Sequence, residues 1–275
     1  MKRTRLPVAA ILLATLTLGC NEPQEGSDGD NKNLPKTTVP TGPCKLEDLK
    51  PYVAGIHQQI ILEEDDSRSS FVISVPKGYD GKKPAPLIVA LHFGGSGLFY
   101  SRGILEGLVQ PAFKDIDPII VAPDVLGRRG WGTEENEKRL LALMAQIENV
   151  YNIDKEKVIV TGFSMGGHGT FYMASRNQER FKAAIPIAGR ARLDKELTWK
   201  IPLRIIHSNG DKTVAIGPTK TYAEEIKKAG ADVEFVELDG VPHHDARLYV
   251  DALKGSVPWL QKQWKKEDNA SSSSK

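Results

Sequence analysis

Apolar residues in this chain follow two patterns that alternate along the sequence. Short runs at 86–91, 118–122 and 183–187 are almost wholly apolar, as strands buried on both faces of a sheet are. Between such runs, as at 134–151 and 217–229, apolar residues recur three or four positions apart, which is typical of helices that cover one face of a sheet. The alternation of the two patterns predicts an α/β fold.

The order of the elements predicts a doubly wound, mostly parallel sheet with an antiparallel N-terminal hairpin. Two β-rich runs, 55–63 and 69–75, flank a polar turn and supply the hairpin, which we place at one edge of the sheet. The later strands are expected at 86–91, 118–122, 157–161, 183–187, 202–207 and 232–238, and the helices at 98–116, 134–151, 165–178, 217–229 and 244–264. Only a short connection, 188–200, separates two of these strands, so no large cap domain is expected and a bulky or polymeric substrate could reach the strand ends.

The first 20 residues have the organisation of an export signal. Basic residues are followed by an apolar run, 8–18, that is too short to span a bilayer. The segment that ends at Cys20 resembles a bacterial lipoprotein signal, in which the cysteine becomes the lipidated first residue, although Thr17 and Leu18 depart from the usual pattern. The alternative is ordinary secretion with cleavage nearby, so the chain is expected to be exported in either case.

The remaining composition divides the chain into a linker, a domain and a tail. Residues 21–43 are rich in Asn, Glu, Gly, Ser, Lys and Pro and predict a flexible linker. Residues 44–266 form the expected globular domain, and the Ser-rich segment 267–275 is expected to be disordered. If Cys20 is lipidated, Cys44 has no partner; a disulfide between the two is the competing interpretation.

Charge excludes some classes of partner. The 275 residues are 40% hydrophobic and 26% charged, with a formal net charge of +2, which is ordinary for a soluble globular domain. The sequence has no long series of basic residues that could follow a phosphate backbone, so a nucleic-acid partner is not expected. Contact with a membrane is expected only through a lipid at Cys20.

The clearest candidate chemistry lies at 158–167, where a β-branched strand leads into Gly-x-Ser-x-Gly and then a helix. This is the setting of a nucleophile elbow, a tight turn that holds a serine hydroxyl above the sheet edge. The candidate nucleophile is Ser164. A Gly-x-Ser-x-Gly pentapeptide alone is a weak signal, so the interpretation depends on an acid and a base at other strand ends.

Both partners occur in the chain order that this arrangement requires, serine, then acid, then histidine. Asp211 follows the strand at 202–207, where the alternative is a turn aspartate bonded to its own backbone. His243 follows the strand at 232–238, and its neighbour His244 is the alternative base. The oxyanion of such a reaction needs two backbone N–H groups. The candidates are Met165, directly after the nucleophile, and Gly94, after the strand at 86–91, where the glycines could otherwise merely turn the chain.

Taken together, the segments 151–154, 160–170 and 181–186 make the chain resemble serine esterases of the α/β-hydrolase superfamily. More narrowly, it is similar to the secreted group that includes polyhydroxybutyrate depolymerases, feruloyl and acetylxylan esterases and predicted peptidases. The resemblance covers roughly residues 55–264. It implies the α/β-hydrolase fold and ester hydrolysis through an acyl-enzyme, with Ser164, Asp211 and His243 as the triad.

One departure from this family bears on the substrate. The family usually has His-Gly where this chain has His92 and Phe93, so Phe93 is expected to shape the substrate site. Trp131, in the loop after the strand at 118–122, is a second candidate to contact a sugar or an aromatic acyl group, with simple packing as the alternative. The histidines at 207, 243 and 244 do not have the spacing of zinc ligands, so no metal is expected. Ester hydrolysis by a serine, a histidine and an aspartate needs no cofactor, so none is expected.

The sequence therefore predicts an exported serine carboxylic ester hydrolase for carbohydrate-linked esters of the feruloyl or acetyl type, with a place in polysaccharide degradation. The alternatives within the enzyme class are a depolymerase of an aliphatic polyester and a peptidase. The alternative from another class is a non-catalytic binding module at the cell surface. An ordered serine, aspartate and histidine argue against the last, because a binding module has no need of all three.

Overall fold

The computed structural model of the chain describes residues 42–64, 67–127, 130–191 and 198–272. These residues belong to one compact unit. The predicted signal segment with Cys20 and the predicted linker up to residue 41 lie outside the described residues. No helix in the described part of the chain is both long enough and apolar enough to cross a bilayer.

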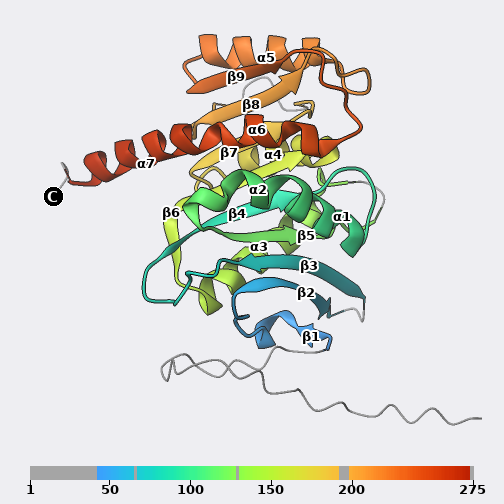
Figure 1. Cartoon of the computed structure of the whole chain (residues 1–275), viewed down its shortest axis with the longest axis vertical. Helices are drawn as coiled ribbons and strands as arrows, with labels where there is room; N and C mark the ends of the chain where they lie inside the picture. The colour runs from blue at the N-terminus through green and yellow to red at the C-terminus, as the bar shows by residue number, and fades with distance from the viewer. Residues whose placement is uncertain (1–41, 65–66, 128–129, 192–197, 273–275) are drawn as a thin grey trace, which may run out of the picture. The chain divides into compact units, whose positions relative to one another are not determined.

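Within the described residues, nine strands form one sheet in the order β1-β2-β3-β5-β4-β6-β7-β8-β9 (Figure 1). Their bounds are β1 Cys44–Lys45, β2 Gly55–Leu62, β3 Arg68–Val75, β4 Ala85–Leu91, β5 Ile119–Pro123, β6 Ile153–Phe163, β7 Ala183–Ile187, β8 Leu203–Ser208 and β9 Val233–Leu238. Strand β3 is antiparallel to β2 and β5, and every pair from β5 to β9 is parallel. The mostly parallel sheet and the antiparallel hairpin that the sequence predicts are therefore both present.

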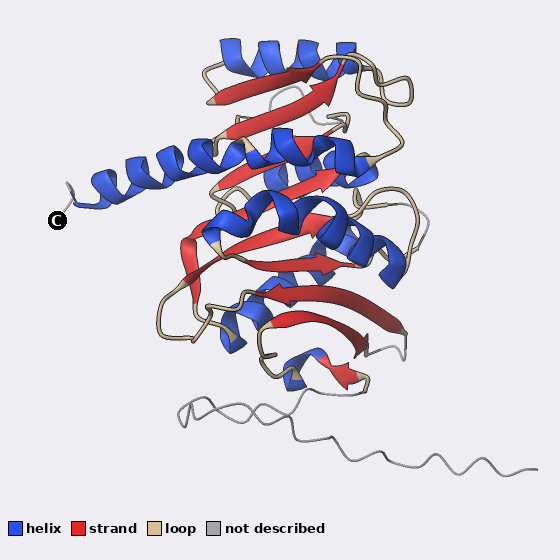
Figure 2. Cartoon of the chain, viewed as in Figure 1, coloured by secondary structure: helices blue, strands red, loops and turns tan. Residues whose placement is uncertain are grey.

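Helices cover both faces of this sheet (Figure 2). One face carries α3 Glu134–Val150, α4 Met165–Arg176 and α5 Ile216–Lys228. The other carries α1 Leu98–Ile104, the π-helical turn η2 Leu105–Val109, α2 Gln110–Phe113, η4 Ala246–Tyr249, α6 Val250–Lys254 and α7 Ser256–Ser272. The short 3-10 turns η1 Leu46–Asp48 and η3 Lys114–Ile116 complete the elements.

The apolar runs of the sequence are explained by this three-layer arrangement. In β4, Leu87, Val89 and Leu91 pack into the core beneath α3, α4 and α5, whereas Ile88 and Ala90 pack into the core beneath α1, α2 and α7. Successive side chains of a strand point to opposite faces, so a strand covered on both faces must be apolar at every position. All five residues have no exposed surface.

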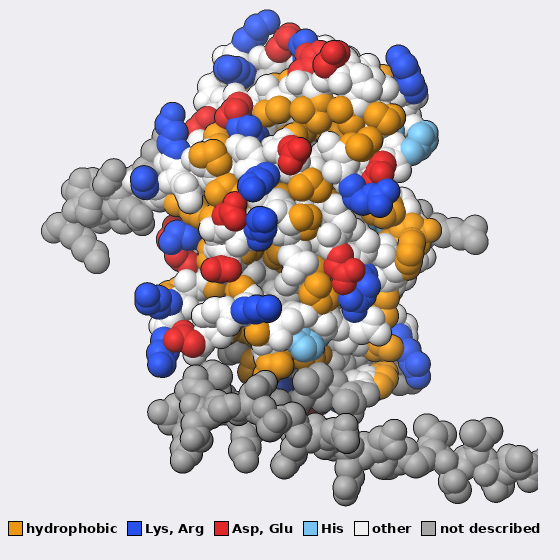
Figure 3. Space-filling model, in the orientation of Figure 1, with side chains coloured by type: hydrophobic (Ala, Val, Ile, Leu, Met, Phe, Trp, Pro, Cys, Tyr) orange, Lys and Arg blue, Asp and Glu red, His pale blue; other side chains and the backbone are white. Residues whose placement is uncertain are grey.

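Charged side chains remain on the outside of the helices. On the face drawn in Figure 3, basic and acidic side chains are interspersed. Among the charged side chains of the described residues, Arg102 is paired with Glu106 at 2.6 Å and Lys254 with Asp115 at 3.5 Å. Exposed pairs of this kind contribute little to stability, but the mixture of signs leaves this face without a single-sign field.

The structure differs from the sequence prediction at several boundaries. The helix expected over 98–116 is divided into α1, η2, α2 and η3. The two-residue strand β1 pairs with β2, so the hairpin is next to the sheet edge and does not form it; a strand this short has no periodicity to detect. The tail expected over 267–275 is also wrong in part, since α7 continues to Ser272. Lys265, Lys266 and Glu267 are good helix formers, and neither Gly nor Pro follows Pro258 to stop the helix.

Topology brings the candidate residues to one edge of the sheet. Strands β4, β6, β7, β8 and β9 are parallel neighbours, so their carboxyl ends lie side by side. The segments that follow these ends hold four of the candidate positions: Gly94, Ser164, Asp211 and His243. Residues distant in the sequence therefore meet where a doubly wound sheet normally binds its ligand.

Candidate active site

Ser164 occupies a strained turn between β6 and α4. Its φ of 57° and ψ of −113° are rare for a residue with a Cβ and cost energy that the surrounding structure must balance. The serine N–H donates to the Ile187 carbonyl oxygen at 2.9 Å, which ties the turn to the end of β7. A Cβ on Gly166 would overlap the carbonyl oxygen of Leu91, and one on Gly162 would lie 2.5 Å from the Gly166 carbonyl oxygen. The glycines of the pentapeptide are therefore required by space.

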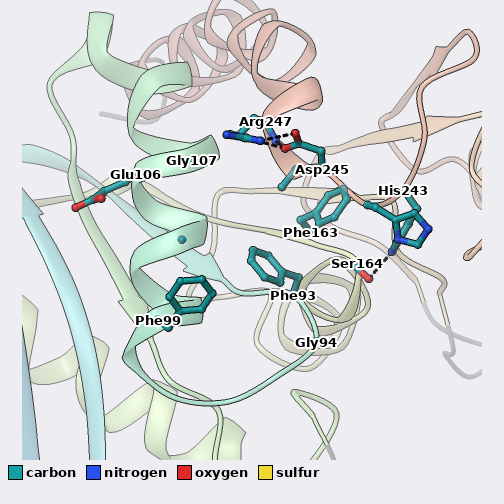
Figure 4. Close-up of a pocket in the computed structure, with 13 residues that line it drawn as sticks. Phe93, Gly94, Phe99, Glu106, Gly107, Phe163, Ser164, His243, Asp245 and Arg247 are labelled. Carbon is teal, nitrogen blue, oxygen red and sulfur yellow. Dashed lines mark hydrogen bonds and ion pairs between the residues drawn. The ribbon is translucent and has the colours of Figure 1, made fainter.

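Ser164, His243 and Asp211 form one hydrogen-bonded series. The Ser164 hydroxyl lies 2.7 Å from Nε2 of His243, and Nδ1 of His243 lies 2.7 Å from Oδ2 of Asp211. Since the carboxylate only accepts, Nδ1 carries the imidazole proton and leaves Nε2 free to accept from the serine. Figure 4 shows the serine and His243 facing each other at one side of a cavity. This is the arrangement that activates a serine hydroxyl as a nucleophile.

The acid is held by its own loop. Oδ1 of Asp211 accepts hydrogen bonds from the N–H groups of Thr213 at 2.9 Å and Val214 at 2.8 Å. Burial acts to raise the pKa of Asp211, but the bonds from Val214, His243 and Thr213 outweigh it and hold the pKa below its usual range. Asp211 is therefore ionised at neutral pH, as the acid of such a triad must be.

The structure selects between the two adjacent histidines. His243 is buried, and its ring stacks on Phe163 with centroids 5.2 Å apart. His244 is exposed, and its ring centroid lies 6.1 Å from that of His243. Only His243 contacts both Ser164 and Asp211 in the bonds described above, whereas His244 lines the cavity.

One candidate oxyanion donor directly follows the serine in the chain, and the other lines the same cavity as the serine. Met165 is the first residue of α4, so its N–H has no acceptor within the helix and can face a ligand. Gly94 lines the same cavity as Ser164. The loop that carries Gly94 is tied down by Asp124, which accepts from the Gly97 N–H at 2.5 Å, and by His92, whose Nδ1 lies 2.6 Å from the Phe93 carbonyl oxygen.

Trp131 does not face the substrate site, so this prediction is wrong. Only 1% of the residue is exposed, and its indole N–H donates to the carbonyl oxygen of His92 at 3.0 Å. The indole lies against Gly169 of α4, where a Cβ would overlap its side chain. Trp131 therefore fastens the loop of Gly94 to the helix that follows the nucleophile. The packing alternative therefore holds.

Phe93 does line the cavity beside Ser164, as expected from the sequence. The cavity has a volume of about 610 Å³. His244, the alternative base, also lines it. Sequence reasoning missed the rest of the wall, which consists of Phe99, Gly103, Glu106, Gly107, Phe163, Asp245, Ala246 and Arg247. Arg247 is paired with Asp245 at 2.8 Å. In Figure 4, Phe93 and Phe163 stand between the serine and Gly107.

Two glycines give the cavity its width on the side of the helical segment. Gly103 and Gly107 are four residues apart, in α1 and η2. A Cβ on Gly103 would lie 3.5 Å from Phe93, and one on Gly107 would lie 3.6 Å from the stem of Arg247. π-Helical turns such as η2 often occur at functional sites. Within the described residues, no group of three or more His, Cys, Asp and Glu side chains is placed to hold a metal ion.

The chain is similar to several known proteins. The profile of the dienelactone hydrolase family matches residues 100–248, more than half of the chain. Feruloyl esterase C of Emericella nidulans is 31% identical over 127 residues, which cover 43% of this chain and 46% of that protein. Cutinase 2 of Thermobifida cellulosilytica is 31% identical over 114 residues, which cover 40% of this chain and 42% of that protein. The matched part is thus less than half the length of these curated relatives.

A solved structure of a ferulic acid esterase shares the architecture. It superposes with a TM-score of 0.64 and 15% sequence identity, over 78% of this chain and 100% of that chain. At this identity the likeness establishes the fold alone.

The position of Trp131 leads to a test by stability. We expect Trp131→Ala to lower the free energy of unfolding by about 3–5 kcal/mol, because it leaves a large buried cavity. The matched control is Phe99→Ala: Phe99 is 78% exposed, so its loss should change stability by less than about 0.5 kcal/mol. Denaturant unfolding measures both. A Trp131→Ala protein as stable as the parent would contradict the buried position.

Proposed function

Because the chain belongs to the dienelactone hydrolase family, we propose that it is a serine hydrolase that cleaves carboxylic esters through an acyl-enzyme. Its α/β-hydrolase fold supports this proposal. The observation that carries it is the series from Ser164 through His243 to Asp211, with 2.7 Å at each step.

The reaction follows from the positions of these groups. Nε2 of His243 takes the hydroxyl proton as Oγ of Ser164 bonds to the ester carbonyl carbon. The carbonyl oxygen becomes an oxyanion, which the N–H groups of Met165 and Gly94 hold. The bond to the alcohol oxygen then breaks, and the alcohol leaves with the proton from His243. Water repeats the sequence on the acyl-enzyme: it gives a proton to His243, and the carboxylic acid departs as Oγ is reprotonated.

The cavity favours an ester with a flat aromatic arm. Phe93 and Phe163 stand between the nucleophile and Gly107 of the cavity wall (Figure 4), and aromatic rings pack well against other rings. The similarity to a feruloyl esterase points the same way. We therefore propose carbohydrate-linked esters, of the feruloyl type before the acetyl type, as the substrate class.

A polyester is the second candidate. The similarity to a cutinase supports it, and so does Phe99, which is 78% exposed at the wall of the cavity and could contact an apolar polymer. Nothing in the described residues specifically favours a peptide substrate. The alternative of a non-catalytic binding module is disfavoured by the assembled serine, histidine and aspartate.

We also propose export with a lipid anchor at Cys20. The support is the basic start, the short apolar run and the polar linker that follows. When the full chain is expressed in bacteria with radiolabelled palmitate, we expect the label in the parent and none in Cys20→Ala. Label that persists in Cys20→Ala would contradict the anchor.

The central assay is hydrolysis of p-nitrophenyl acetate and methyl ferulate by the purified protein. We expect Ser164→Ala and His243→Ala each to lower kcat by about 10³-fold or more, because members of a triad act as a unit. His244→Ala is the matched control, since His244 lies next in the chain but outside the series; its kcat should stay within about threefold of the parent. An inactive parent would refute the esterase, and loss of activity in His244→Ala alone would make His244 the base.

The two helix glycines give a test of the substrate's size. Gly107→Leu places a branched side chain at the cavity wall, so we expect kcat/KM for methyl ferulate to fall by about tenfold or more. Hydrolysis of p-nitrophenyl acetate should change by less than about threefold, because its acyl group is too short to reach the wall. Gly217→Leu, on α5 where a Cβ meets open space, is the control for a new leucine on a helix. Equal loss for both esters would contradict this assignment of the cavity.

A further inference from the structure

A second histidine contacts the acid of the triad. His207, at the end of β8, has no exposed surface. Its Nε2 lies 2.9 Å from the carbonyl oxygen of Val214 and 3.4 Å from Oδ2 of Asp211. The reaction described above uses neither of its ring nitrogens.

The surroundings of His207 fix its protonation. A carbonyl oxygen only accepts, so Nε2 carries the proton and donates a hydrogen bond to the carbonyl oxygen of Val214. The other nitrogen, Nδ1, is buried and has no hydrogen-bond partner within the described residues. Burial lowers the pKa of His207, although the contacts to Val214 and Asp211 act in the opposite direction. The imidazole is therefore neutral, with its single donor aimed at the loop of the acid.

Val214 connects this histidine to the catalytic carboxylate. Its C=O accepts from His207, and its N–H donates to Oδ1 of Asp211 at 2.8 Å. The other carboxylate oxygen, Oδ2, accepts from His243. The loop between β8 and α5 lies outside the strands of the sheet. The side-chain hydrogen bonds from His207 and to Asp211 therefore fix the position of its backbone.

We propose that His207 is a positioning residue for catalysis, which holds Val214 and through it the carboxylate of Asp211 in line with His243. The proposal rests on the proposed esterase function. His207 does not touch the substrate or the reacting atoms. It acts through the orientation of Asp211, on which the tautomer and direction of His243 depend.

A histidine that merely fills the core would behave differently from a positioning residue. The first would affect stability and leave the chemical step of the folded protein unchanged. The second would affect kcat while KM for a small ester stays the same, and a side chain with a donor at the same distance would restore it. A glutamine amide nitrogen can occupy the place of Nε2, whereas a leucine cannot donate.

The experiment compares His207→Leu and His207→Gln in the full chain, with p-nitrophenyl acetate as the ester. We expect His207→Leu to lower kcat by roughly 10- to 100-fold with KM changed by less than about threefold, as misplacement of a catalytic group does. His207→Gln should keep kcat within about fivefold of the parent. All assays are run well below the thermal transition of each variant, which circular dichroism measures, so that only folded protein is compared.

Tyr151→Phe is the matched control for loss of a buried hydrogen bond. The Tyr151 hydroxyl accepts from the Tyr52 N–H at 2.7 Å. This hydrogen bond lies next to the strands at the opposite edge of the sheet from β8, so removal of the hydroxyl should leave kcat unchanged. The positioning role is overturned if His207→Leu keeps the parent kcat, if His207→Gln loses as much as His207→Leu, or if Tyr151→Phe loses as much as either. Activity of the parent and its loss in Ser164→Ala establish the esterase separately, so failure of one proposal is distinguishable from failure of the other.

Discussion

The close approach of helix α4 to the ends of β4 and β7 is the constraint on which the site depends. A Cβ on Gly166 would overlap the Leu91 carbonyl oxygen of β4, and one on Gly167 would overlap the Ile187 carbonyl oxygen of β7. These strands flank β6 in the sheet. The helix can therefore begin directly above the sheet edge only because both positions are glycine. Ser164 adopts its strained conformation in the turn that leads into this helix.

The other parts of the site are fixed relative to this turn by contacts from distant parts of the chain. Trp131 joins α4 to the loop of His92, which carries the candidate oxyanion donor Gly94, and the hydrogen bonds around Asp211 position this carboxylate at the end of β8. The acid stays ionised although it is buried, because backbone N–H groups and His243 stabilise its charge. The orientation of the candidate catalytic groups thus comes from a rigid sheet edge and a few buried polar bonds, as preorganisation requires.

Much of the fold could be predicted from the sequence because apolar periodicity reports which faces are buried. It gave the alternation of strands and helices, and strand order placed Ser164, Asp211 and His243 at one edge. It could not report β1, which has two residues, or the division of α1, η2 and α2. The burial of Trp131 depends on its contact with Gly169, and the shape of the cavity wall depends on how the helical segment that carries Gly107 is rotated. Both features are set by packing between segments that are distant in the sequence. No role could be assigned to His207 from the sequence, because a buried histidine at the end of a strand gives the same pattern whether it fills the core or positions another residue.

The most direct test of the account is the mass of the protein after reaction with a fluorophosphonate, followed by peptide mapping. If the strained turn, His243 and Asp211 together make Ser164 nucleophilic, one phosphonyl group is added per chain. It should lie on Ser164 and be absent from Ser164→Ala. Failure to label the folded parent protein, or a label on any other residue, would contradict the central claim.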